Sequence, residues 1–459
     1  MSTITERGTR MFSTTQTHLT REQKGAVGLL SIGTFLEYFD LMLYVHMAVL
    51  LNELFFEPSN PLTASLYTAL AFCSTYLLRP IGALIFGWLG DNIGRKITVI
   101  ITTTMMSASC IVMANLPTYA EVGITASILV TICRMVQGLS SMGEIIGASI
   151  YVTEITKPPV QYPAENMIYI FSALGGLAAL GMAYFVMHHD FNWRYAFWAG
   201  AGIALVGSIA RTKLRETPDF ANAKLRVKNI IEKAGFDSNS MKTNPIIQEK
   251  VNTKSVIALF LINCGWPACF YLLYFHCGTV LKNSFGYTGA QIITHNFYIS
   301  VAQVLSFIFM GYLSYHIYPL LVVKFRIVIF SIIILAFPYL LDNLTSPSEL
   351  LTFQLILMTF SLTFCSAHAI QYRHFPVFKR FTYSSFLYAV SNILIYSITS
   401  LGFVYLTYYF GNYGILVLMI PIIAGFAYGL NHFENLEIQA GNYYRTGTYS
   451  FKPHPLSPR

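Results

Sequence analysis

The stretch that decides the fold reads Gly87-Trp-Leu-Gly-Asp91-Asn-Ile-Gly94-Arg95-Lys96 and separates two apolar runs, 64–90 and 97–116. Its glycines allow a tight turn and a close approach of backbone segments. Its aspartate can accept hydrogen bonds at a helix N-terminus, and its two basic residues suit the anionic inner face of a membrane. The stretch therefore predicts a short polar turn that joins two membrane-spanning helices.

The composition around this turn is typical of a polytopic membrane protein. Of the 459 residues, 54% are apolar and only 11% are charged, and the mean hydropathy is +0.54. Because a soluble domain usually carries about 25% charged residues, this composition excludes a typical cytosolic enzyme, a disordered chain and a nucleic-acid-binding protein. The seven cysteines form no CxxC pair, so the sequence predicts neither a disulfide framework nor a metal-binding motif.

Apolar runs of membrane-spanning length recur along the chain. A spanning helix needs about 20 apolar residues and a spanning β-strand about 10, and the runs here are of the longer kind. We therefore predict an all-α membrane protein with twelve transmembrane helices in two six-helix halves. The expected spans are 26–52, 64–90, 97–116, 122–152, 165–187, 193–211, 255–281, 289–314, 318–341, 348–371, 383–408 and 412–431.

The one long polar stretch lies in the middle of the chain and divides it six plus six. It predicts an N-terminal six-helix bundle over 26–211, a central cytoplasmic loop over 212–254 and a C-terminal six-helix bundle over 255–431. Cytoplasmic tails are expected over 1–25 and 432–459. Two halves joined in this way are the plan of many secondary transporters. The first apolar run is too long, and too charged, for a cleaved signal peptide.

The basic residues indicate how the helices are oriented. Nearly all of the 29 Lys and Arg fall in the tails, the central loop and the hairpin loops of the same side, whereas the other side holds only Arg194 and Lys282. Because cytoplasmic loops are enriched in Lys and Arg, both termini are expected in the cytoplasm of a multi-pass protein in a bacterial cytoplasmic (inner) membrane. The net charge of +8 then reflects orientation rather than a nucleic-acid surface.

The turn that opens this section resembles the signature loop of the major facilitator superfamily. That loop reads Gly-x-Leu-x-Asp-x-x-Gly-Arg-Lys, and each specified position is filled here. In the superfamily the loop latches the two halves on the cytoplasmic side and gates the switch between outward-open and inward-open states. The resemblance implies the major facilitator fold and gating roles for Gly87, Asp91, Gly94, Arg95 and Lys96.

Five further segments resemble the metabolite:proton symporter family within that superfamily. They are 33–44, 78–82, 134–144, 192–194 and 215–220. The family includes proton-coupled carriers of proline and glycine betaine and carriers of 2-oxoglutarate, citrate and shikimate. The resemblance spans the N-terminal half, and the C-terminal half matches only in its helix pattern. It implies proton symport of a small zwitterionic osmolyte such as proline or glycine betaine, with symport of an organic acid as the alternative.

Charged residues inside the spans are the candidate proton and substrate sites. A charge at the centre of a span costs about 2.5–3.5 kcal/mol on insertion scales, so such residues usually face a cavity. Glu37 and Asp40 are three residues apart and share a helix face, where two close carboxylates raise each other's proton affinity. Arg134 could hold one acid charged or bind a substrate carboxylate, and Glu144 lies on the same helix. We expect these four to carry the proton and the substrate; a structural ion-pair network is the alternative.

Aromatic and histidine residues are the candidates for the cavity wall. Trp266-Pro267 interrupts the seventh run, and broken helices often line transporter cavities. Aromatic faces attract quaternary ammonium groups, which fits betaine. Arg79, next to Pro80, is expected to be structural and to pair with an acid of another span. His276, His295 and His368 are each expected to be hydrogen-bonded polar residues rather than proton relays. The possible lining residues are Tyr44, Gln137, Trp266, Tyr271, Tyr274 and His276.

Two segments depart from the family pattern. The second-half counterpart of the signature, 311–316, has Tyr315 at the acidic position, and a Pro-rich turn, 157–163, replaces a basic one. Both departures weaken the expected latch and leave open a non-transporting paralogue or sensor that keeps the fold. The tail 432–459 lacks the heptad repeat of a coiled coil.

The expected partners are a small-molecule substrate and the lipid bilayer. No nucleic acid, metal or obligate protein partner is expected, and no cofactor apart from a driving proton. An enzyme is not expected either, because the sequence has no nucleophile–base spacing, phosphate loop or metal cluster.

Overall fold

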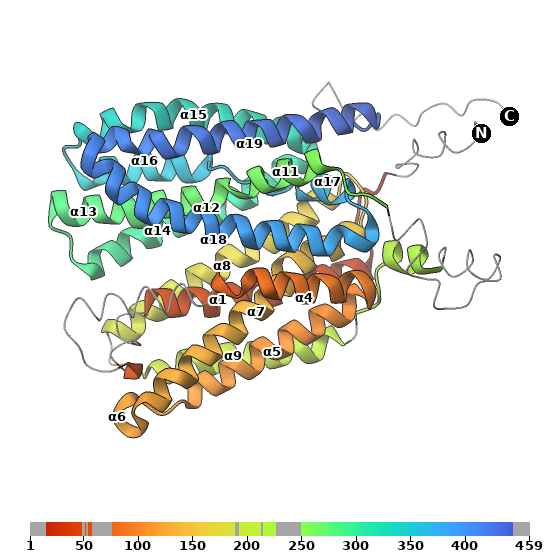
Figure 1. The fold of residues 1–459 in the computed structure, drawn as a ribbon, viewed down its shortest axis with the longest axis horizontal. Coiled ribbons are helices and arrows are strands. Elements are labelled where there is room, and N and C mark those ends of the chain that lie inside the picture. Colours follow the sequence, from red (N-terminus) through yellow and green to blue (C-terminus); the bar gives the residue numbers. More distant parts are fainter. Residues whose placement is uncertain are drawn as a thin grey trace.

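The protein consists of two helical bundles that lie side by side (Figure 1). The structure is a computed structural model. It describes residues 15–47, 51, 54–56, 76–188, 192–212, 214–225 and 249–443. These residues form helices and one isolated bridge, between Gln16 and Pro159, and within them there is no β-strand.

The first bundle is built from helices that precede the central polar stretch. They are α1 (Arg21–His46), α4 (Arg79–Asn92), α5 (Arg95–Asn115), α6 (Tyr119–Val122), α7 (Ile124–Ile155), α8 (Gln161–His188) and α9 (Trp193–Arg211). Helix α1 begins at a capping box, in which the Thr20 side chain accepts from the Gln23 backbone N–H and the Gln23 side chain accepts from Thr20. Such a box satisfies two backbone donors that a helix start leaves open.

The second bundle is built from helices that follow the central polar stretch. They are α11 (Thr253–Asn263), α12 (Gly265–Phe270), the π-helical turn η2 (Tyr271–His276), α13 (Cys277–Phe285), α14 (Gly289–His316), α15 (Pro319–Asp342), α16 (Pro347–Thr359), α17 (His368–Arg373), α18 (Val377–Phe410), the 3₁₀ turn η3 (Gly411–Tyr413) and α19 (Gly414–Gln439). Gly286 ends α13 in the left-handed conformation, and Thr288 opens α14 with a second capping box. Both are the usual signals for a tight turn between helices.

The tenth expected span, 348–371, is wrong as a continuous helix. Helix α16 ends at Thr359, and an irregular segment over 360–367 leads to α17. The guanidinium of Arg326 on α15 donates to the carbonyl oxygens of Ser361 at 2.9 Å and Thr363 at 3.4 Å. Irregular backbone is tolerated at membrane depth only where it is buried and its polar groups are satisfied, and this buried arginine supplies those hydrogen bonds.

Other boundaries also differ from the expected ones. Helix α18 begins at Val377 rather than 383, and α19 continues to Gln439, past the expected end at 431. The seventh span is interrupted near Trp266, as expected, and then continues through the π-helical turn. Part of the second span lies outside the described residues. Within them, eight helical stretches are long and apolar enough to cross a membrane, so the twelve-span count stays a prediction.

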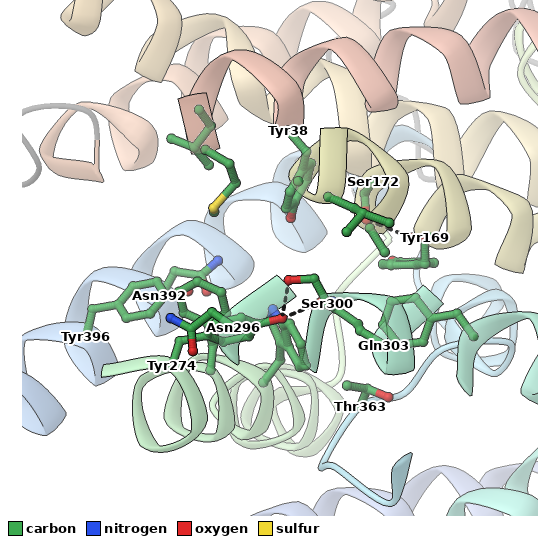
Figure 2. A pocket seen from close by; sticks show the side chains of 18 of the residues that line it. Tyr38, Tyr169, Ser172, Tyr274, Asn296, Ser300, Gln303, Thr363, Asn392 and Tyr396 are labelled. Atoms are coloured by element: carbon green, nitrogen blue, oxygen red, sulfur yellow. Dashed lines mark hydrogen bonds between the residues drawn. The ribbon is translucent and has the colours of Figure 1, made fainter. Parts of the chain in front are cut away.

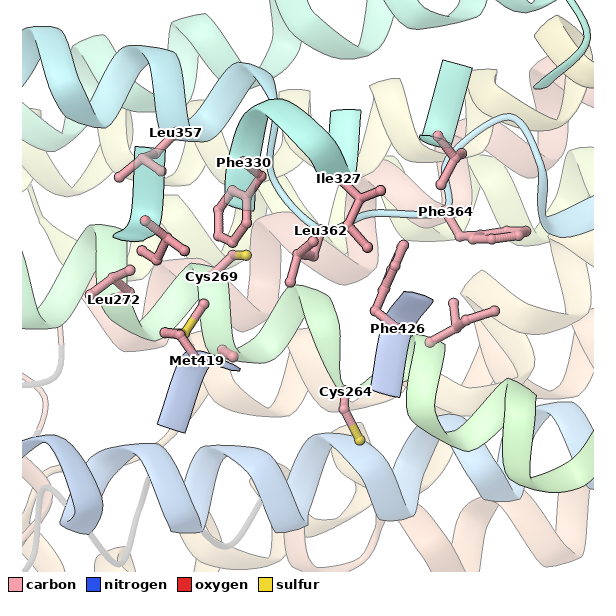
Figure 3. Packing of buried hydrophobic residues seen from close by; sticks show 14 of the residues in the cluster. Cys264, Cys269, Leu272, Ile327, Phe330, Leu357, Leu362, Phe364, Met419 and Phe426 are labelled. Atoms are coloured by element: carbon pink, nitrogen blue, oxygen red, sulfur yellow. The ribbon is translucent and has the colours of Figure 1, made fainter. Parts of the chain in front are cut away.

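Each bundle contains a large cluster of buried apolar side chains, and a third cluster contains residues of both bundles. In the second bundle Cys269, Phe330, Leu357, Leu362 and Phe426 belong to one cluster of buried side chains (Figure 3). Large apolar side chains also point outward, such as Leu401, which is 63% exposed. Outward apolar side chains would be costly in water but suit a lipid-facing surface.

Helices α1 and α8 make the tightest contact of the first bundle. A Cβ atom added at Gly175 on α8 would overlap the carbonyl oxygen of Phe35 on α1, whereas one added at Gly181, two turns further along α8, would meet nothing within 4 Å. The absence of a side chain at Gly175 therefore permits this approach of the two helices.

We expect Gly175→Ala to lower the stability of the purified protein, because overpacking typically costs about 1–3 kcal/mol. Gly181→Ala is the matched control and should be neutral or stabilising by up to about 1 kcal/mol, since alanine is the better helix former. Thermal unfolding in detergent measures both. Equal midpoints for the two variants would contradict the packing described here.

Candidate functional site

A central cavity of about 410 Å³ lies between the two bundles (Figure 2). Its wall comes from α1, the start of α4 and α8 on one side, and from α11 to η2, α14, segment 362–368 and α18 on the other. We name the two ends of the molecule after the α4–α5 turn (the Asp91 end) and the α13–α14 turn (the Gly286 end). The lining includes Gly289 and Ala290, so the cavity extends toward the Gly286 end.

The wall of the central cavity is aromatic and carries one arginine. Arg79 is the only Lys or Arg among the described lining residues, and that lining contains no Asp or Glu. The Arg79 guanidinium lies 4.5 Å from the ring centroid of Tyr76. Tyr38, Trp266 and Phe270 also line the cavity. In such a cavity the guanidinium can bind a carboxylate, and the aromatic faces can bind a cationic group of the same small molecule.

Hydrogen bonds hold several polar groups of the wall. The Tyr274 hydroxyl lies 3.0 Å from the Ser300 hydroxyl and donates to Gln303 Oε1 at 3.2 Å. Across the cavity, the hydroxyls of Tyr38 on α1 and Tyr388 on α18 lie 3.3 Å apart. This second contact joins the two bundles beside the cavity.

Asp40 and Arg134 face each other inside the first bundle rather than at the cavity wall. Arg134 Nη1 lies 4.0 Å from Asp40 Oδ2 and donates to Gln137 Oε1 at 2.9 Å. The guanidinium also lies 4.1 Å from the ring centroid of Tyr44, and Cys110 Sγ lies 3.5 Å from Asp40 Oδ1. Three other predicted site residues, Asp40, Tyr44 and Gln137, therefore lie beside Arg134, although none of the four lines the cavity.

Glu37 shares α1 with Asp40 but faces a different arginine. It is buried, and its charge interacts with Arg79 and with Tyr38. Each carboxylate thus has its own guanidinium partner. The Arg79 guanidinium interacts electrostatically with Glu37 of another helix. Arg79 also lines the cavity, which its sequence context did not indicate. Glu144 lies in α7, and its side chain falls outside the described part of the structure.

The remaining predicted lining residues divide into two groups. Trp266 and Tyr274 line the central cavity. Tyr271 stacks on Phe403 with ring centroids 5.8 Å apart, and His276 lies 5.3 Å from the same ring. The π-helical turn shifts the helical register, and Tyr271 and His276 pack against α18 instead.

The other two histidines named in the sequence analysis, His295 and His368, lie in different surroundings. His295 Nε2 is 2.7 Å from Gln354 Oε1, a hydrogen bond of the expected kind. His368 lines the central cavity.

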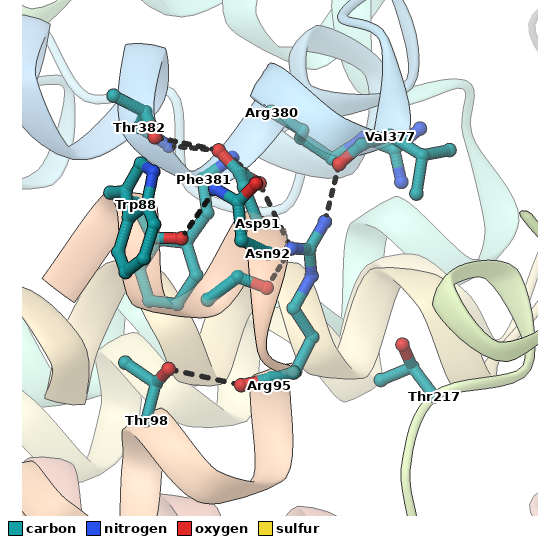
Figure 4. A network of polar contacts seen from close by, with 12 residues as sticks. Trp88, Asp91, Asn92, Arg95, Thr98, Thr217, Val377, Arg380, Phe381 and Thr382 are labelled. Atoms are coloured by element: carbon teal, nitrogen blue, oxygen red, sulfur yellow. Dashed lines mark hydrogen bonds and ion pairs between the residues drawn. The ribbon is translucent and has the colours of Figure 1, made fainter. Parts of the chain in front are cut away.

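Asp91 joins the two bundles at the Asp91 end (Figure 4). Its Oδ1 accepts from the backbone N–H of Phe381 at 3.0 Å, and its Oδ2 accepts from that of Thr382 at 2.8 Å. Arg95 Nη1 donates to Asp91 Oδ1 at 2.9 Å, and its Nη2 donates to the carbonyl of Val377 at 2.6 Å. Two residues of the turn therefore hold the first turns of α18.

Glu154 at the end of α7 is the acceptor that completes this network. Its Oε1 accepts from Arg95 at 3.2 Å and from Arg380 on α18 at 2.9 Å. Its Oε2 accepts from the hydroxyl of Thr217 at 2.6 Å. At the rim, Asp219 lies 3.6 Å from Arg380, and partial burial together with the nearby Glu154 carboxylate raises the pKa of Asp219. We name Asp91, Arg95, Glu154, Thr217 and Arg380 the latch.

Glycines of the turn permit this contact. A Cβ at Gly87 would lie 2.6 Å from Thr382 Cα, and one at Gly90 would overlap the Phe381 ring. Gly94 has a φ of +149°, which side chains rarely adopt. Lys96 is partly exposed at the start of α5. Sequence reasoning missed Glu154, Thr217 and Arg380 because nothing in a linear pattern shows which distant residues meet.

The two segments that depart from the family pattern are bound by residues near the N-terminus. The Tyr315 hydroxyl donates to the carbonyl of Thr17 at 3.2 Å. The Gln16 backbone N–H donates to Pro158 O at 2.9 Å, and Val160 N–H donates to Gln16 O at 3.3 Å. Residues 16 and 17 therefore connect the first bundle to the second at the Asp91 end.

The sequence is similar to a known family and to several bacterial transport proteins. A family model described as Major Facilitator Superfamily matches residues 30–397. The proline/betaine transporter of Salmonella typhimurium is 32% identical over 202 residues, which cover 42% of this chain and 40% of that protein. The chain thus spans about two fifths of the length of the proline/betaine transporters it matches. The inner membrane metabolite transport protein YhjE of Escherichia coli is 28% identical over 387 residues, 79% of this chain and 83% of that protein.

Solved structures show the same fold at low sequence identity. A proton:xylose symporter, XylE, has a TM-score of 0.70 at 14% identity, with 92% of this chain and 96% of that chain covered. The human organic anion transporter MFSD10 has a TM-score of 0.60 at 13% identity, with 90% of this chain and 99% of that chain covered.

We expect Glu154→Gln to loosen the Asp91 end, because both arginines of the latch lose their shared negative partner in a buried site. Breaking a buried ion pair by removing one partner typically costs about 3–5 kcal/mol. Spin labels on exposed positions 93 and 316 would report the separation of the two bundles by double electron–electron resonance. Glu121→Gln, at an exposed acid outside the latch, is the control. Identical distance distributions in all three proteins would argue against a closing role for Glu154.

Proposed function

Because the chain belongs to the Major Facilitator Superfamily, we propose that it is a secondary active transporter that works by alternating access in a bacterial cytoplasmic membrane. The observation that carries this proposal is the pairing of a central cavity between two bundles with a latch that joins them at one end. Transporters of this plan bind substrate between their halves and expose it to one side at a time.

The distribution of basic residues indicates the side of the membrane that the cavity faces. The positive-inside rule places the Asp91 end in the cytoplasm together with both termini. With the latch formed at that end and the cavity extending toward the other, the state is outward-facing. The same proposal includes twelve spans, of which α18 and α19 form the last two.

We propose a small zwitterion, such as proline or glycine betaine, as the substrate. Arg79 offers the charge-assisted hydrogen bonds that a carboxylate prefers, and the surrounding aromatic faces suit an ammonium group. The described lining holds no acid that would repel the carboxylate. The name of the proline/betaine relatives supports this choice.

An organic acid is the second candidate. YhjE, the relative that aligns over 83% of its length, is named as a metabolite transport protein, and Arg79 would bind the carboxylate of an organic acid equally well. A dicarboxylate, however, needs a second cationic partner, and the described lining offers only Arg79 besides the histidines His46 and His368. The zwitterion therefore fits better.

We propose the proton as the driving ion and the Asp40–Arg134 pair as one place where it acts. The carboxylate and the guanidinium are both buried, so protonation of Asp40 would remove the negative partner of Arg134 within a site of low dielectric. Such a change leaves the buried Arg134 charge without its counter-ion, a costly state that favours a different packing of α1 against α7.

The decisive experiment is uptake into proteoliposomes that contain the purified full-length protein. Labelled proline, glycine betaine and 2-oxoglutarate are offered separately under an inward proton gradient, with and without a protonophore. Protonophore-sensitive accumulation of a zwitterion supports the proposal, and accumulation of 2-oxoglutarate supports the second candidate. Absence of accumulation and of exchange for all three would contradict it and favour a non-transporting paralogue or sensor.

We expect Asp40→Asn to abolish accumulation driven by a pH gradient, because the amide cannot take up the proton, while membrane insertion stays intact. Glu121→Gln, which neutralises an exposed acid, should transport like the wild type. Western blotting of membranes and initial uptake rates measure the two effects. Normal driven uptake by Asp40→Asn would remove this residue from the coupling mechanism.

We expect Arg79→Gln to weaken substrate binding by at least about tenfold, since hydrogen bonds to a charged group are worth about 1.5–3 kcal/mol. Arg194→Gln removes an arginine outside the cavity and is the matched control. Titration of each purified variant with labelled glycine betaine gives the dissociation constants. Unchanged affinity in Arg79→Gln would mean that the carboxylate binds elsewhere.

A further inference from the structure

A buried carboxylate and a histidine face each other across the boundary between the bundles. Glu165 lies on α8 of the first bundle and His368 on α17 of the second. The distance from His368 Nδ1 to Glu165 Oε1 is 3.8 Å, and the Glu165 side chain is fully buried. The Ser149 hydroxyl donates to the same Oε1 at 2.6 Å. The two groups therefore lie within ion-pair distance of each other but form no direct hydrogen bond.

Glu165 differs from the other buried acids of the molecule in its partners. Asp40, Asp91 and Glu154 each have an arginine nitrogen within 4.0 Å. Among the residues that the structure describes, the only nitrogen of a basic side chain within that distance of Glu165 belongs to His368. Its second oxygen, Oε2, and His368 Nδ1 are both buried without a hydrogen-bond partner in that part of the chain.

The titratable groups around this pair are almost all neutral. Tyr169 on α8 stacks on the His368 ring with centroids 4.7 Å apart, and the Tyr372 ring on α17 lies 6.1 Å from the same ring. Cys365 in segment 360–367 also faces Glu165. Behind these groups, Tyr388 on α18 acts on Tyr372 and Arg326 on α15 acts on Cys365. No acid of the latch and no arginine contacts the pair directly in the described structure.

This arrangement is suited to bind a proton. An isolated carboxylate in a buried site is costly, and the cost falls when the carboxyl binds a proton or shares one with a neighbouring base. His368 gives such a proton a route, because its side chain is 12% exposed and lines the central cavity. Water in the cavity can therefore deliver a proton to the imidazole, which stands directly before Glu165.

We propose that Glu165 and His368 form a proton-binding pair that bridges the two bundles beside the central cavity. The proton enters on the imidazole ring from cavity water and then passes to the Glu165 carboxylate, which it neutralises. The Asp40–Arg134 pair lies within one bundle, whereas this pair joins both, so its occupancy stabilises the contact of α8 with α17. The claim that this proton drives symport rests on the proposed function, whereas the claim that the pair binds a proton does not.

Infrared difference spectroscopy of the purified protein tests the site without any substrate. Spectra recorded in acidic and alkaline buffer should contain a C=O stretch of a protonated carboxyl group that disappears as the pH rises. Glu165→Gln should delete this component, Asp40→Asn should retain it, and His368→Gln should change its midpoint pH. Survival of every carboxyl component in Glu165→Gln would overturn the proposal.

A second variant guards against loss of folding in Glu165→Gln. Ser149→Ala keeps the carboxyl group but removes its hydrogen bond, so the frequency of the same C=O component should change. Size-exclusion chromatography verifies that each variant is folded. An unchanged component in folded Ser149→Ala would mean that the observed carboxyl is not Glu165.

Transport assays distinguish a role of Glu165 in proton coupling from a role in proton binding alone. Folded Glu165→Gln should lose proton-driven accumulation of labelled proline or glycine betaine but retain their exchange across the membrane, because exchange needs no net proton movement. Retention of driven accumulation, or loss of both activities, would overturn a coupling role. If the wild type carries neither compound, the proposed substrate fails while the infrared result still decides the proton site.

Discussion

The Glu154 carboxylate is the constraint on which the described state depends. It accepts hydrogen bonds from two arginines that belong to different bundles and from a threonine beyond the last helix of the first bundle. Charge-assisted hydrogen bonds of this kind are about twice as strong as neutral ones. The carboxylate is buried, so salt in solution screens it little. Because α5, α7 and α18 meet at this group, the closure of one end of the molecule is set there.

The order and length of the apolar runs were enough to predict most of the helices. Helices α5, α7, α14 and α15 lie within a few residues of the expected spans, because a window of hydropathy detects a long apolar segment directly. The tenth span failed for a physical reason. Hydropathy cannot show that a buried guanidinium from α15 will satisfy the carbonyls of Ser361 and Thr363 and so permit a break in the helix.

The site was predictable where a local motif marks it and not elsewhere. The turn around Asp91 follows from its glycines and charges, and the contact of Asp40 with Arg134 follows from the rarity of charges in spans. Glu154, Arg380 and Glu165 carry no local pattern, since their partners lie tens or hundreds of residues away in the chain. The lining role of Arg79 depends on the place of α4 in the bundle, which no spacing reveals.

The segment formed by residues 16 and 17 has a practical consequence for work on this protein. These residues contact the 157–160 turn of one bundle and Tyr315 of the other, at the same end as the latch. An affinity tag or fluorescent protein fused directly ahead of Gln16 would disturb the joint that opens in the proposed transport cycle. Fusions placed after α19, which ends at Gln439 on the second bundle, leave that joint untouched and are the sounder choice for purification and imaging.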